Sequence, residues 1–117
     1  MIGWILVGAA IGAVAITVLD KFWESIAQWL NNTAADVVGK YLGVGARKCM
    51  HRTVSTVTRV RSAIHNVSVI YAKKTPRDSF YERVTCQSDA PVYTIDKGVL
   101  NEIEKQGKIE QTFEYRQ

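Results

Sequence analysis

Four side chains of the kinds that bind zinc occur in this chain: Cys49, His51, His65 and Cys86. Cys49 and His51 are two residues apart in a stretch predicted to be helical, so their side chains point in different directions. The four residues match no structural zinc pattern, in which the ligands come in close pairs, and we expect no metal ion. Because the cysteines also lack CxxC spacing, we expect two unpaired thiols in a reducing compartment.

The motifs give no support to other catalytic chemistry. Serine, histidine and aspartate all occur, but no spacing selects a nucleophile and its base. Gly39, Gly43 and Gly45 lack the partner strand and the GK[ST] ending of a phosphate-binding loop. Glu102 and Glu104 are typical of a solvated helix surface. We therefore expect a protein that is not an enzyme and that has no cofactor.

The most prominent element is the apolar segment Met1–Leu19, in which no ionisable side chain occurs before Asp20. A helix of about 20 apolar residues spans a hydrocarbon core of about 30 Å, and the segment predicts a transmembrane helix. Trp4 and Trp23 are separated by about 28 Å along a helix, as the two interfacial aromatic belts are. The alternatives are a cleaved signal peptide, for which the positive n-region is missing, and a buried helix, which needs a large host.

The helix is expected to continue from Asp20 to Leu30 as an amphipathic extension, with Trp29 as a third interfacial anchor. Asn31-Asn32 predicts its end. Cations follow the apolar segment and none precedes it, which favours an N-out orientation with the C-terminal domain in the cytoplasm.

Small residues gather on one face of the predicted span. Gly8 and Gly12 form a GxxxG motif, and Ala15 extends it by one further step. Such a face lets two helix backbones approach closely, so we expect self-association or packing on a partner's helix.

Cations are concentrated in the middle of a chain whose formal net charge is +4. No Asp or Glu occurs from Val37 to Arg77, where nine Lys or Arg residues do. Beside a membrane this pattern favours anionic lipid, at about 1 kcal/mol per cation, and nucleic acid is a less favoured partner. The residues expected at an anionic surface are Lys48, Arg52, Arg59, Lys73, Lys74 and Arg77.

A basic amphipathic helix is predicted at residues 46–64. Met50, Thr53 and Val57 belong to an apolar stripe that recurs in steps of three and four, with cations on the opposite side. Valine and threonine are poor helix formers, but strict alternation is absent, so we favour a helix over a strand. A shorter helix, capped by Thr33, is expected before it, with a glycine hinge at 43–45.

The last third of the chain predicts a small sheet with one helix. Thr75–Asp78 is a turn in which Pro76 fixes φ, and Asp96 is a suitable helix N-cap. The expected elements are strands at Asn66–Lys74, Ser79–Gln87 and Val92–Ile95, a helix at Lys97–Gln106 and a final edge strand at 109–116.

Together these patterns predict an α+β protein: an N-terminal single transmembrane α-helix, a small helical region and a β-β-β-α-β unit. The expected units are a span with its interfacial extension at 1–31, a basic helical region at 32–65 and an antiparallel sheet with one helix at 66–117. We expect a single-pass, membrane-anchored structural or adaptor protein that forms a homo-oligomer or a larger membrane assembly. A small pore-forming or membrane-disrupting protein and a membrane-tethered nucleic-acid-binding domain are the alternatives.

Overall fold

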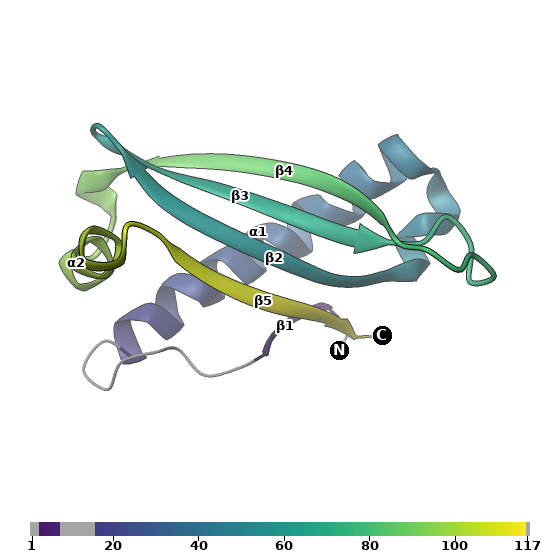
Figure 1. Cartoon of the computed structure of the whole chain (residues 1–117), viewed down its shortest axis with the longest axis horizontal. Coiled ribbons are helices and arrows are strands. Elements are labelled where there is room, and N and C mark those ends of the chain that lie inside the picture. The colour runs from purple at the N-terminus through teal and green to yellow at the C-terminus, as the bar shows by residue number, and fades with distance from the viewer. Residues whose placement is uncertain (1–2, 8–15, 117) are drawn as a thin grey trace.

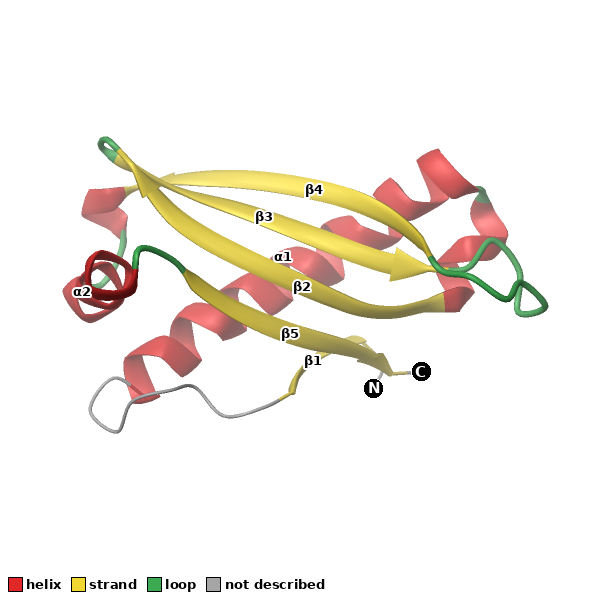
Figure 2. Cartoon of the chain, viewed as in Figure 1, coloured by secondary structure: helices red, strands yellow, loops and turns green. Residues whose placement is uncertain are grey.

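One long helix lies along one face of a curved antiparallel sheet (Figure 1). The computed structural model describes residues 3–7 and 16–116. Figure 2 shows short helices at both ends of the sheet and the long helix α1 behind it. The elements are β1 (Gly3–Val7), α1 (Ile16–Leu42), η1 (Val44–Cys49), β2 (Met50–Val60), β3 (Ala63–Ala72), β4 (Glu82–Pro91), η2 (Val92–Thr94), α2 (Lys97–Gln106) and β5 (Ile109–Arg116).

The strands are ordered β1-β5-β2-β3-β4, and every neighbouring pair is antiparallel. β2, β3 and β4 follow one another as a meander, and the chain then returns through α2 so that β5 pairs with the free side of β2. The strand predicted at 109–116 is confirmed, but it does not lie at an edge. β1 pairs with its other side, where Leu6 is opposite Phe113.

The apolar stripe of α1 forms the core together with the inner face of the sheet. Trp23 is only 2% exposed and packs edge-to-face on Phe113 of β5, with ring centroids 6.1 Å apart. Removing such a ring from a core costs about 3–5 kcal/mol. The buried residues of the stripe recur every three or four positions: Leu19, Trp23, Ile26, Leu30, Ala34 and Val38.

The membrane span predicted for Met1–Leu19 is wrong. Residues 3–7 form the strand β1, and α1 begins only at Ile16. Across the described ranges of the chain, no helix has the length and apolarity needed to cross a bilayer. α1 is amphipathic: Asp20 and Glu24 are exposed, whereas Trp23 is buried. The single-pass membrane localisation and the N-out orientation, which depended on the span, are therefore not supported.

The basic helix predicted at residues 46–64 is also wrong, because β2 and the start of β3 occupy most of this stretch. Thr53 and Val57 are four residues apart, and an even step of four fits one face of a strand as well as one face of a helix. Ser55, which lies between them on the same face, is polar, so the sequence shows no regular alternation of apolar and polar residues. Ser55 is buried despite being polar, because its hydroxyl pairs with that of Ser68. The β-branched residues then favour the strand.

The remaining boundaries differ less. α1 continues through Asn31-Asn32, where an end was predicted, and past Thr33, where a new helix was expected. The strands predicted at 66–74 and 79–87 exist as β3 and β4, and residues 92–94 form a 3₁₀ turn rather than a third strand. α2 has the predicted bounds: Asp96 Oδ1 accepts a hydrogen bond from the Gly98 amide at 2.8 Å, and Gly107 ends the helix at a φ of 81°.

Candidate functional site

Polar side chains interrupt the otherwise apolar inner face of the sheet. Alternation along the strands directs Ser55 of β2, Asn66 and Ser68 of β3, and Ser88 of β4 toward α1. Ser55 is the cross-strand partner of Ser68, and Asn66 is that of Ser88. These four residues are called the polar network below.

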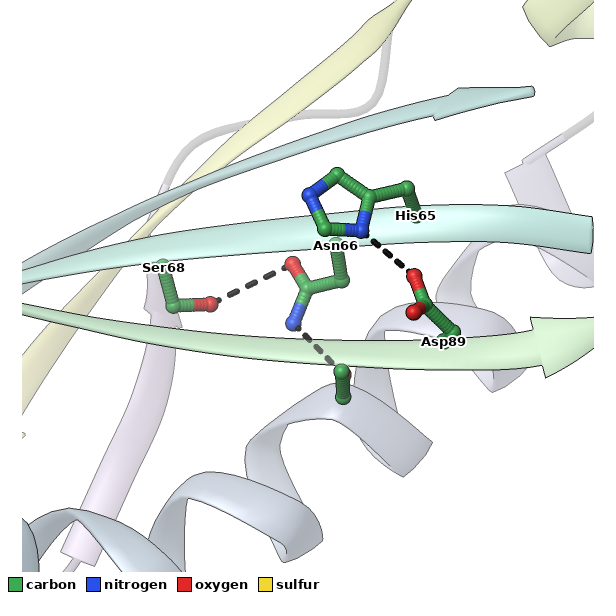
Figure 3. A network of polar contacts seen from close by, with 5 residues as sticks. His65, Asn66, Ser68 and Asp89 are labelled. Carbon is green, nitrogen blue, oxygen red and sulfur yellow. Dashed lines mark hydrogen bonds and ion pairs between the residues drawn. The ribbon is translucent and has the colours of Figure 1, made fainter. Parts of the chain in front are cut away.

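Hydrogen bonds join the polar network across three strands. The hydroxyl oxygens of Ser55 and Ser68 are 2.6 Å apart. Ser68 donates to Asn66 Oδ1 at 3.2 Å, and Asn66 Nδ2 donates to Ser88 Oγ at 3.2 Å (Figure 3). Asn66 is 2% exposed and Ser55 and Ser68 are fully buried, so these bonds offset a desolvation cost of about 1–3 kcal/mol for each group.

The network ends at a cavity of about 500 Å³ between the first half of α1 and the sheet. Ile26, Ile64 and Val99 are its buried apolar lining, and Asn66 is its buried polar lining. Phe22 and Trp29 of α1 add two half-buried aromatic rings. The other lining residues are Lys21, Ser25, Ser88, Asp89, Ala90, Thr94, Ile95 and Asp96.

The exposed lining residues form the rim, and their charges are mixed. Lys21 carries a positive charge, whereas Asp89 and Asp96 carry negative charges. Asp96 is already engaged as the N-cap of α2, and Asp89 Oδ1 lies 2.5 Å from His65 Nδ1. His65 and Asn66 project from opposite faces of β3, so His65 is not part of the cavity wall (Figure 3).

The residues predicted to anchor a membrane helix have separate locations. Trp23 is in the core, and Trp29 lines the cavity. Trp4 belongs to β1, where its backbone is opposite Tyr115. The predicted association residues Gly8, Gly12 and Ala15 lie outside the described residues.

The predicted anionic-surface residues do not form one stripe. Arg59, near the β2–β3 turn, pairs with Glu104 at 3.1 Å. Lys73 lies near the opposite end of the sheet, with its ammonium 4.9 Å from the centroid of the Tyr81 ring. Arg52 makes a cation–π contact with Tyr71, with its Cζ atom 4.6 Å from the centroid of the ring. Of the other three, Lys74 and Arg77 are exposed in the β3–β4 connection, and Lys48 belongs to η1.

Both cysteines are free thiols; Cys86 is buried, whereas Cys49 is half-buried. Burial raises the pKa of the Cys86 thiol above its usual value, because the thiolate would lose its hydration. Within residues 3–7 and 16–116, no three Cys, His, Asp or Glu side chains gather in a way that could hold a metal ion.

Comparisons of the chain with protein-family models, with curated proteins and with solved structures find no match. The candidate site therefore rests on its own geometry. None of the four residues of the polar network was singled out from the sequence. The signal that reveals them is parity: Asn66 and Ser68 alternate in step with Ile64 and Ile70, at positions where a strand buries its side chains.

Proposed function

We propose that the protein binds a small, largely apolar molecule in the cavity between α1, β3, β4 and α2. The observation that carries this proposal is a cavity of about 500 Å³. Its buried lining is aliphatic apart from the amide of Asn66, two half-buried aromatic rings lie against it, and its polar and charged residues lie at the rim or, like Ser88, are bonded to Asn66. Ligand sites commonly have volumes of about 300–1,000 Å³, apolar walls and a few polar groups that orient the ligand.

The cavity opens to solvent, since Lys21, Asp89 and Asp96 at its rim are exposed, so a ligand can enter it. The lining also comes from both layers of the fold: Phe22 and Trp29 from α1, and Ile64 and Ala90 from the sheet. The adaptor role expected from the sequence stays a prediction that none of these contacts tests.

Binding is tested with N-phenyl-1-naphthylamine, a neutral fluorescent probe whose emission rises in apolar surroundings. We expect a saturable rise with one site per chain. Ala90→Phe should abolish it, because Ala90 lies directly opposite Ile64 on the cavity wall. The matched control is Ala63→Phe, which places the same ring on the outer face of β3.

The two variants decide the proposal together. Their circular dichroism spectra must match that of the wild-type protein, so that lost fluorescence reports a filled cavity rather than unfolding. A wild-type protein that gives no saturable rise would contradict the proposal. Equal binding by the Ala90→Phe and Ala63→Phe variants would contradict it as well.

A further inference from the structure

The polar network has a direction, because each hydroxyl has only one hydrogen to donate. Ser68 donates its hydrogen to Asn66 Oδ1 at 3.2 Å. At the 2.6 Å contact between Ser55 and Ser68, Ser55 must therefore be the donor. Asn66 continues the series in the same direction, since its Oδ1 accepts from Ser68 and its Nδ2 donates to Ser88 Oγ. The hydrogen bonds are thus donated in one direction, from Ser55 of β2 through Ser68 and Asn66 of β3 to Ser88 of β4.

The donors at the end of this series have no acceptor among the described residues. Among the hydrogen bonds between described residues, none uses the hydroxyl hydrogen of Ser88 or the second amide hydrogen of Asn66. Both residues line the cavity. The acceptor oxygens, Asn66 Oδ1 and Ser88 Oγ, already receive one hydrogen bond each. Hydrogen bonds in series also polarise one another, which strengthens the last donor.

The charges around the cavity favour a ligand with a neutral acceptor oxygen over one with an anionic acceptor. The rim holds one cation, Lys21, and two carboxylates, Asp89 and Asp96, so it offers an anion no net attraction. The deeper lining, with Ile64 and Val99, is apolar, and an anion would lose its hydration there. A neutral oxygen needs only the two donors.

From these observations we infer that the ligand carries a neutral carbonyl-type oxygen, which accepts hydrogen bonds from Ser88 Oγ–H and Asn66 Nδ2–H while its apolar body lies against Phe22 and Trp29. This inference rests on the proposed function, since it names the chemistry of the molecule that the cavity takes.

Two probes of nearly the same shape test the inference by displacing N-phenyl-1-naphthylamine from the wild-type protein. 2-Acetylnaphthalene carries a carbonyl oxygen, and 2-isopropenylnaphthalene carries a methylene group in its place. One net hydrogen bond predicts that the ketone binds roughly three- to tenfold more tightly. If the dye itself gives no saturable binding, the proposed function fails. If the dye binds and neither probe displaces it, the proposed function stands and the carbonyl inference is overturned. If both displace it equally well, binding stands and the carbonyl inference is overturned.

Ser88→Ala removes the terminal hydroxyl and should reduce the preference for the ketone to less than about twofold, while the affinity for the hydrocarbon stays. Ser25→Ala is the matched control: Ser25 also lines the cavity, but its hydroxyl donates to the Lys21 carbonyl of its own helix at 3.2 Å. It should keep the full preference. A ketone preference that survives in Ser88→Ala, or that is lost equally in both variants, would overturn the role of Ser88.

Discussion

Thr53 is a buried hydroxyl that the polar network does not reach. It lies on the inner face of β2, two residues before Ser55, and is fully buried. Within the described residues, its Oγ1 has no hydrogen-bond partner. A buried hydroxyl without a partner loses its bonds to water and gains none in return, so this residue lowers the stability of the fold.

Thr53→Val should therefore raise the free energy of unfolding by about 1 kcal/mol, because it keeps the branched shape and replaces the hydroxyl by a methyl group. Urea denaturation measures the change. Ser55→Ala is the comparison: it removes a hydroxyl that is bonded, and it should lower the free energy of unfolding by about 1–3 kcal/mol. The interpretation of Thr53 fails if both substitutions destabilise the protein by the same amount.

At the scale of elements, the C-terminal end of α1 contains two glycines with opposite roles. Gly39 lies inside the helix, where glycine costs up to about 1 kcal/mol relative to alanine. A methyl group there would lie 3.0 Å from Cδ of Arg47, whose partly exposed side chain lies 3.8 Å from Asp36 and would have to shift slightly. Gly43 follows the helix at a φ of 100°, a backbone conformation that L-residues with a side chain rarely adopt.

Alanine at these two positions should change stability in opposite directions. We expect Gly39→Ala to raise the free energy of unfolding by up to about 1 kcal/mol. Gly43→Ala should lower it by about 1–2 kcal/mol, since open space around Gly43 does not relieve the strain of its positive φ. Thermal unfolding of both variants measures the shifts. Destabilisation by Gly39→Ala would mean that Arg47 is held in place rather than free to move.

Capping and terminating residues correctly predicted the element whose ends they set, the helix α2. α2 has an N-cap in Asp96 and a terminating Gly107, and its bounds follow from these residues. β2 and α1 depend on what they pack against. Ser55 can point into the core because its hydroxyl is hydrogen-bonded to Ser68 of the neighbouring strand, and the sequence does not show that pairing. The apolar segment Met1–Leu19 has the composition of a transmembrane helix, and that composition does not reveal that residues 3–7 pair with β5.

The candidate site was harder to predict than the fold. Its polar residues are serine and asparagine, which are common and belong to no spacing motif. They become a site only where the strand register places Asn66 opposite Ser88, under Phe22 and Trp29 of a helix far away in the sequence. A sequence pattern that identifies individual strands does not contain this information.

At the scale of the whole molecule, α1 and the sheet cannot hold their structure separately. Among the described residues, the buried face of α1 packs against the sheet, α2 and η1, and Trp23 packs edge-to-face on Phe113. Small domains with one shared core usually unfold in a single transition. We expect the helical far-UV signal and the tryptophan fluorescence to change at the same urea concentration.

Separate midpoints for these two signals would contradict a shared core and would point to a helix that is stable without the sheet. The Trp23→Ala variant provides a control, because a cavity at the interface between the layers should lower both midpoints together. The expected loss is about 3–5 kcal/mol.

The strand order also sets a sequence of events during synthesis. β1 is made first, yet its hydrogen-bonding partner is β5, more than a hundred residues later: Gly3 pairs with Arg116. β5 in turn needs β2 on its other side, where Val57 pairs with Ile109. On the ribosome, residues 3–7 must therefore wait until β5 has been translated before their strand can pair with it. Such distant pairing slows folding and leaves an apolar segment uncovered for the whole of that time.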